Sequence, residues 1–121
     1  IKYFGFVNQR EKFSLLKKSW ILVHPSLKEG WGLSVIEAGS QKTPTVGYNV
    51  EGLRDSIING KTGILVKENP KELARKIAFL INNKKKYREI SKNSYELSQK
   101  FSWLESTQKS WKIVSKITHE E

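Results

Sequence analysis

The sequence contains no cysteine, no methionine and a single aspartate, Asp55. Without cysteine the chain can form no disulfide, no zinc-thiolate site and no thiol nucleophile, and a reducing cytoplasm is the expected compartment. A lone aspartate cannot build an Asp-x-Asp metal clamp, and the two histidines, His24 and His119, lie far apart in sequence. We therefore expect neither a metal ion nor another cofactor.

Long apolar runs are also missing. No stretch approaches the roughly 18 apolar residues that indicate a membrane span, and residues 1–7 lack the basic and hydrophobic regions of a signal peptide. The 121 residues correspond to one modest domain or to part of a larger one. Because the chain begins at Ile1 and has no methionine, we expect that further sequence precedes it.

Acidic residues are few beside the basic ones, and the formal net charge is +10. Such a balance suggests nucleic acid or an anionic membrane as a partner. However, the only dense basic run is KKKYR at residues 84–88, and a solvated helix junction explains it better than a binding patch. Lysine also outnumbers arginine, whereas bidentate recognition of bases and phosphates favours arginine, so we expect no nucleic-acid partner.

Short β-rich runs alternate with helical patterns over the first two thirds of the chain, which predicts βαβ units and a Rossmann-like parallel sheet with flanking helices. The expected strands are residues 3–7, 20–24, 45–48 and 63–66, and the expected helices lie near residues 10–18, 33–41 and 53–58.

After Val66 the pattern becomes helical. Asn69 followed by Pro70 predicts a capped helix start, and an apolar face follows at Leu73, Ile77, Leu80 and Ile81. A second helix is expected at residues 86–99 with Tyr87, Ile90 and Leu97 inward, and a capping box predicts an amphipathic helix at residues 102–118. We therefore divide the chain into a partial α/β domain, residues 1–101, and a helical tail, residues 102–121.

The loop that follows the strand at residues 20–24 is the candidate site. In open α/β sheets, ligands bind beyond the carboxyl ends of the strands, against the next helix N-terminus. Gly30 and Gly32 allow close approach, so that backbone amides near Gly32, Leu33 and Ser34 can point at an anion such as a diphosphate.

Two glutamates, Glu29 and Glu37, flank these amides. A carboxylate can accept two hydrogen bonds from a vicinal diol, so the pair suits a ligand with a diol at each end and a diphosphate between them. A nucleotide sugar has that shape. For Glu37 an exposed position on the helix surface is an equally good interpretation of the pattern.

The stretch HPSLKEGWGLSVIEA, followed by TPTVGYNVEGLRDSIINGKTGILV and closing with KFSWLESTQKSW, resembles the retaining glycosyltransferases of family 4, two-domain enzymes of the GT-B fold. The match to the family motif comprises Pro25, Ser26, Glu29, Gly30, Trp31, Gly32 and Glu37. The resemblance implies that Glu29 contacts the donor sugar at the catalytic centre and that Glu37 holds the ribose hydroxyls. It further implies that Gly30, Trp31, Gly32, Leu33 and Ser34 form the donor-binding segment, with amides on the diphosphate.

On this resemblance the chain is the C-terminal donor-binding domain of a cytoplasmic hexosyltransferase. Such an enzyme transfers a hexose from a nucleotide diphosphate sugar to a glycan or lipid-linked acceptor without a metal. The family's basic pair and its acceptor groups lie upstream, so the chain alone is expected to be inactive. The tail 102–121 would dock on the N-terminal domain, and the basic surface would allow peripheral contact with an anionic membrane.

The sequence departs from the family pattern at two positions. Lys42 replaces a glycine after the helix that carries Glu37, and Asp55 replaces a glutamate in what we expect to be the loop after Gly52, where we assign it a structural role. Phe6 and Val7 correspond to residues near the nucleobase, but a core strand is the better interpretation for both.

Two other functions remain open at this point. One is a noncatalytic basic α/β module that binds nucleotides or nucleic acid, which the net charge supports but which gives no reason for Glu29 and Glu37. The other is an interaction domain whose sugar site is vestigial.

Overall fold

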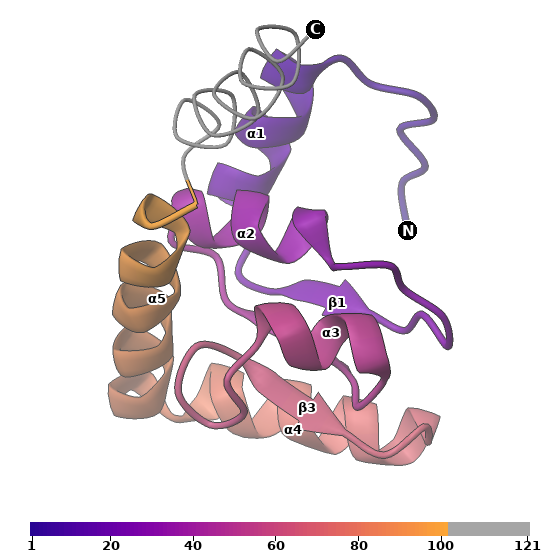
Figure 1. Ribbon diagram of the computed structural model, residues 1–121, viewed down its shortest axis with the longest axis vertical. Coiled ribbons are helices and arrows are strands. Elements are labelled where there is room, and N and C mark those ends of the chain that lie inside the picture. The colour runs from indigo at the N-terminus through magenta and orange to yellow at the C-terminus, as the bar shows by residue number, and fades with distance from the viewer. Residues whose placement is uncertain (102–121) are drawn as a thin grey trace, which may run out of the picture.

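The computed structural model describes residues 1–101, and the predicted tail helix lies outside them (Figure 1). The described part contains a parallel sheet of three strands in the order β1-β2-β3. The strands are β1 (Leu22–His24), β2 (Thr45–Tyr48) and β3 (Ile64–Val66), with Leu22 opposite Thr45 and Val46 opposite Ile64. The predicted α/β class with a parallel sheet and flanking helices is confirmed.

Five helices accompany this sheet within residues 1–101. They are α1 (Gln9–Lys18), α2 (Leu33–Ser40), α3 (Glu51–Ser56), α4 (Pro70–Asn82) and α5 (Lys84–Gln99). Figure 1 shows α5 standing beside the sheet, where it contacts both α2 and α4. None of the described helices is both long and apolar enough to span a bilayer.

The core lies between the sheet and its helices, and Val46, Leu53, Leu80 and Ile90 are fully buried in it. The predicted start of α4 is confirmed, because the Asn69 side chain accepts a hydrogen bond from the Lys71 amide at 2.8 Å. The prediction for Ile81 is wrong: its side chain is 48% exposed. One residue turns a helix by about 100°, so with Leu80 facing the core its neighbour turns toward solvent.

The predicted strand at residues 3–7 is not formed. This segment is extended, but it pairs with none of the three described strands, and β1 is hydrogen-bonded only to β2. A β-rich pattern is a local property, whereas a strand needs a partner. The Phe6 side chain is fully exposed and Val7 is only half-buried, so the core-strand interpretation of both is wrong.

Three further boundaries differ from the prediction. Helix α3 begins at Glu51 and not at residue 53. It contains Asp55, as the predicted helix at residues 53–58 did, so the expectation of a loop at Asp55 is wrong. Strand β1 begins at Leu22, which leaves Trp20 outside it. Helix α5 begins at Lys84, because the Asn83 side chain accepts from the Lys86 amide at 3.0 Å and caps it.

The basic run 84–88 thus forms the first turns of α5, directly after the junction at Asn83, with Lys84, Lys85 and Arg88 exposed. Tyr87 in this run ties α5 to the segment before β1, since its hydroxyl donates to the Trp20 carbonyl at 2.7 Å. Partial burial raises the pKa of the Tyr87 phenol above its usual value of 10.0.

Candidate functional site

The loop between β1 and α2 leaves the sheet at the carboxyl end of β1, as predicted, and enters α2 through Gly32 (Figure 1). Gly32 has φ 72°, in the left-handed region that favours glycine. A Cβ there would lie 2.5 Å from Ser56 Oγ and 3.1 Å from Leu53 Cδ2, so the packing against α3 also disfavours a side chain at this position. Gly30 has no positive φ and no protein atom within 4 Å of an added Cβ, so its predicted role, close approach of a ligand, stays a prediction.

The first turn of α2 presents its backbone amides toward this loop. No side chain among the described residues caps the helix, and its first backbone bond runs from the Val35 amide to the Gly32 carbonyl at 2.9 Å. The amides of Leu33 and Ser34 precede that bond and, as at any helix start, have no partner inside the helix. Such amides and the helix dipole attract an anion.

Glu37 is buried, with 7% of its surface exposed, so the alternative of an exposed position on the helix is wrong. It lies in a buried stretch of α2 that α1 and α5 cover. Lys12 of α1 offsets the cost of the buried charge, since its Nζ lies 2.8 Å from Glu37 Oε2. Among residues 1–101, this oxygen accepts no hydrogen bond of good geometry, and it retains acceptor capacity for a ligand.

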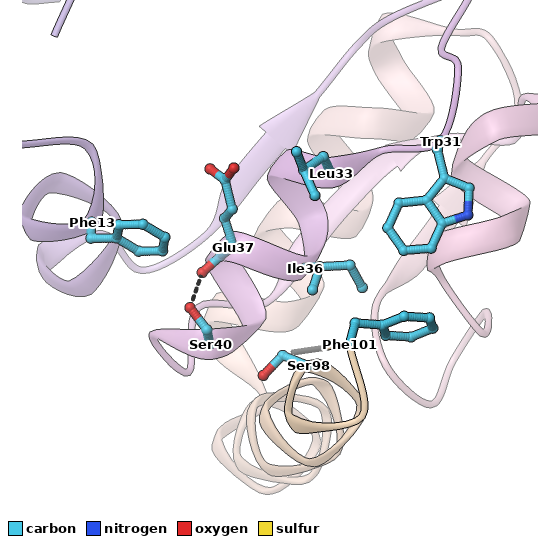
Figure 2. Close-up of a pocket in the computed structure, with 8 residues that line it drawn as sticks. All are labelled: Phe13, Trp31, Leu33, Ile36, Glu37, Ser40, Ser98 and Phe101. Carbon is cyan, nitrogen blue, oxygen red and sulfur yellow. Dashed lines mark hydrogen bonds between the residues drawn. The ribbon is translucent and has the colours of Figure 1, made fainter. Parts of the chain in front are cut away.

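Glu37 also lines a cavity of about 450 Å³ together with two other predicted site residues, Trp31 and Leu33. Figure 2 shows the Glu37 carboxylate rising between Phe13 of α1 and Leu33. The remaining lining residues are Ile36, Ser40, Ser98 and Phe101. The Trp31 ring meets the Phe101 ring edge-on with centroids 5.2 Å apart, so the wall is mostly apolar around one carboxylate.

Glu29 lies in the loop at the other end of the Gly30–Ser34 segment, outside the lining of this cavity. Its side chain is 29% exposed, and its Oε2 lies 3.4 Å from Nε2 of His24, the last residue of β1. The structure thus brings Glu37, Trp31 and Leu33 together and places Glu29 beside His24. That one ligand bridges the two glutamates stays a prediction.

Sequence reasoning missed three residues that shape this site. Lys12 has no sequence signal that links it to Glu37, and His24 was considered only as a metal ligand. Gly52 packs so closely on the loop that a Cβ would lie 2.0 Å from the Glu29 carbonyl oxygen. A glycine in the first turn of a short helix was the available signal for that contact.

The described residues offer no group of three or more His, Cys, Asp or Glu side chains that could hold a metal ion. The ligand chemistry that this part of the chain does present consists of helix amides, two carboxylates and an apolar wall. This combination fits a polar, anionic ligand with hydroxyl groups.

Comparison with known proteins places this chain in a family. The family model described as "Glycosyl transferases group 1" matches residues 1–97. The chain belongs to the group 1 glycosyl transferases. Among curated relatives of this group, the trehalose synthase of Thermococcus litoralis is 36% identical over 86 residues, which are 71% of this chain and 21% of the relative. An uncharacterized glycosyltransferase of Methanocaldococcus jannaschii is 37% identical over 84 residues, 69% of this chain and 24% of the relative.

Solved structures of glycosyl transferases share the fold. Sucrose-phosphate synthase from Thermosynechococcus elongatus superposes with a TM-score of 0.92 at 24% identity, over 99% of this chain and 31% of that one. HepE of Anabaena, in complex with UDP and glucose, gives a TM-score of 0.87 at 24% identity, over 95% of this chain and 32% of that one. The C-terminal domain of a group 1 protein from Francisella tularensis gives 0.72 at 28% identity, over 80% and 51%.

These likenesses show that the group 1 chain has the Rossmann-like α/β fold of GT-B glycosyltransferases. The chain spans less than a quarter of the length of the two curated relatives above.

Proposed function

We propose that this chain is the C-terminal donor-binding part of a retaining, family 4 hexosyltransferase. The enzyme would transfer a hexose from a nucleotide diphosphate sugar to a glycan or lipid-linked acceptor. The observation that carries the proposal is the uncapped start of α2 at Gly32, with Glu29 before it and buried Glu37 behind it. Membership of the group 1 family and the neighbour bound to UDP and glucose support it.

In this proposal each part of the site takes one part of the donor. The amides of Leu33 and Ser34 hold the diphosphate at the helix start, and Glu37 accepts hydrogen bonds from the ribose hydroxyls. Glu29, the catalytic-site carboxylate, contacts the donor sugar. Trp31 and Gly30 complete the segment between them.

The leaving nucleoside diphosphate carries negative charge that the enzyme has to stabilise. Preorganised helix amides serve this purpose because they need no reorganisation when the bond breaks. The basic groups that complete the diphosphate site would lie on upstream chain. No metal is needed in this scheme, in keeping with a sequence that has a single aspartate.

In this proposal Glu37 interacts with Lys12 and with the ribose at the same time. A carboxylate has about four lone-pair positions, so Glu37 can keep its 2.8 Å ion pair with Lys12 and still accept from a diol. The ammonium balances the charge of the carboxylate, and hydrogen bonds to a charged acceptor are the stronger ones.

Calorimetric titration of the intact protein with UDP-sugars and GDP-sugars tests the proposal. Glu37→Gln should weaken binding of the matching sugar nucleotide roughly 10- to 100-fold, the loss expected for hydrogen bonds to a charged group. Glu72→Gln removes another ion-paired glutamate, on the surface of α4, and should leave affinity unchanged. Absence of binding by the intact protein, or equal affinity for Glu37→Gln, would contradict the proposal.

The rest of the enzyme follows as part of the same proposal. Residues 1–101 are the second half of the donor domain, and the tail 102–121 docks on an N-terminal domain that supplies the acceptor site. The chain by itself would then transfer nothing, and the enzyme would work in the cytoplasm. A noncatalytic nucleic-acid-binding module remains the rival, and it predicts steeply salt-dependent binding of RNA or DNA in place of sugar nucleotides.

A shallow hollow on α5 favours a membrane as a further partner. Three basic residues and one acidic residue line it, and the volume is about 430 Å³. The lining residues are Lys42, Tyr87, Arg88, Ser91, Lys92, Tyr95 and Glu96. Lysine and arginine attract anionic headgroups, and tyrosine suits the interface. We propose peripheral docking on anionic lipid, which sedimentation with phosphatidylserine vesicles should detect and rising salt should reverse. Equal binding to neutral phosphatidylcholine vesicles would contradict it.

A further inference from the structure

His24 occupies a position that the proposed function leaves unexplained. It is the last residue of β1, its side chain is 11% exposed, and its Nε2 lies 3.4 Å from Glu29 Oε2. The other ring nitrogen, Nδ1, is buried and has no hydrogen-bond partner among residues 1–101. Within the described part of the chain, Glu29 is therefore the one charged residue paired with the His24 ring.

Glycines hold both members of this pair in place. Gly47 of β2 is opposite His24 in the sheet, and a Cβ there would lie 3.0 Å from the His24 carbonyl oxygen and 3.3 Å from the His24 Cβ. Gly52 packs against Glu29 in the same way, since a Cβ on Gly52 would lie 2.0 Å from the Glu29 carbonyl oxygen. A side chain at either glycine would push against His24 or Glu29, so the backbone of each residue is closely packed on a neighbouring element.

A fixed backbone does not by itself orient a glutamate. Its side chain has three torsions, and on a partly exposed loop it samples many orientations, which costs entropy when a ligand fixes one. His24 is stiffer, since its ring is largely buried at the end of a strand. The Nε2 atom, 3.4 Å from Oε2, restricts the carboxylate on that side and leaves Oε1 able to accept from another donor.

We propose that His24 is a positioning residue, which holds the Glu29 carboxylate in the orientation that accepts hydrogen bonds from the sugar of the donor. This inference rests on the proposed function, because it takes Glu29 as the group that contacts the sugar. It adds a residue that reaches no part of the donor and acts only through Glu29.

The test compares a sugar nucleotide with the same nucleotide lacking the sugar. In the intact protein, His24→Leu removes Nε2 and should weaken binding of UDP-glucose, or of GDP-mannose, about tenfold, as loss of a polar contact with a charged group does. Affinity for UDP or GDP should stay within about twofold, because the nucleotide does not touch Glu29. His24→Gln places an amide donor near the position of Nε2 and should restore most of the affinity for the sugar nucleotide.

A double-mutant cycle shows whether His24 acts through Glu29. In a Glu29→Gln background, His24→Leu should have no further effect on affinity for the sugar nucleotide, whereas independent roles would give additive losses. Should His24→Leu fail to fold, as judged by thermal melting, His24→Asn replaces it, since asparagine is polar but too short to reach Glu29.

The outcomes separate this inference from the proposed function. Wild-type protein that binds neither the sugar nucleotides nor the nucleotides overturns both. Wild-type binding together with equal weakening of UDP-glucose and UDP by His24→Leu shows that His24 only packs the loop, and it overturns the positioning role alone. Additive losses in the cycle overturn it as well.

Discussion

Gly30 and Gly52, both next to the Glu29 backbone, have very different surroundings. A Cβ on Gly52 would lie 2.0 Å from the Glu29 carbonyl oxygen, whereas a Cβ on Gly30 would meet nothing within 4 Å. Gly52→Ala should therefore lower the free energy of unfolding by about 1–3 kcal/mol, the usual cost of overpacking. Gly30→Ala should change it by less than about 0.5 kcal/mol. Urea denaturation followed by circular dichroism measures both, and equal costs would contradict the close packing of α3 on the loop.

Lys42 has φ 61° at the end of α2, the only non-glycine residue with positive φ in the described part of the chain. The Lys42 amide donates to the Gly39 carbonyl and the Thr43 amide to the Ala38 carbonyl, a helix ending in which glycine is usual. The departure at Lys42 that the sequence indicated thus corresponds to real backbone strain.

Replacement of Lys42 should reveal that strain. Lys42→Gly and Lys42→Ala both remove the ammonium that lies 5.2 Å from the Tyr95 ring, so they differ only in the Cβ. Lys42→Gly should be more stable than Lys42→Ala by about 1 kcal/mol, because alanine keeps the left-handed strain and glycine does not. Thermal denaturation of the two variants decides this, and an alanine variant as stable as the glycine variant would show that the strain is negligible.

The helices and strands that the sequence predicted correctly are those whose formation depends on residues near one another in the chain. The three strands that form, the start of α4 at Asn69 and the loop before α2 follow from apolar runs, caps and turn residues near one another in sequence. Residues 3–7 show the limit of such signals. Their pattern is as β-rich as that of β2, but pairing depends on a neighbour that sequence order does not supply.

Adjacent residues of α4, Leu80 and Ile81, test which face of this helix packs on the core, because they are similar in size. Leu80 is fully buried, whereas Ile81 is 48% exposed. Leu80→Ala should lower the free energy of unfolding by about 2–5 kcal/mol, through lost burial and the cavity that remains. Ile81→Ala should cost less than about 1 kcal/mol. Comparable losses in chemical denaturation would mean that α4 is rotated relative to its described position.

The candidate site combines elements that lie far apart in the chain. Lys12 comes from α1, Glu37 from α2, and Ser98 and Phe101 from the end of α5 and the residues after it. The sequence motif predicted Glu37, Trp31 and Leu33, since these are close in sequence. It could not predict that Glu37 is buried, because the helices that cover it are contributed by distant segments.

The sheet has two unpaired edges in the described residues, one at β1 and one at β3. Strand β1 is paired only on its β2 side, and the extended residues 3–7 carry the fully exposed Phe6. An unpaired edge and a β-rich segment without a partner are features that proteins usually cover. Since the chain spans 21% of a trehalose synthase relative, we predict that upstream chain in the intact protein supplies the missing strands.

Hydrogen exchange measured by mass spectrometry tests this arrangement. The amides of residues 3–7 should exchange at least about 100-fold more slowly in the intact protein than in the 121-residue chain, because pairing in a sheet limits exchange to rarer openings. The β2 amides are the internal control, since β2 already lies between β1 and β3 and should be protected in both. Protected β2 amides together with unchanged exchange at residues 3–7 would show that upstream chain does not extend the sheet there. The upstream cations that the proposed function assigns to the diphosphate would then have to come from chain that does not pair with residues 3–7.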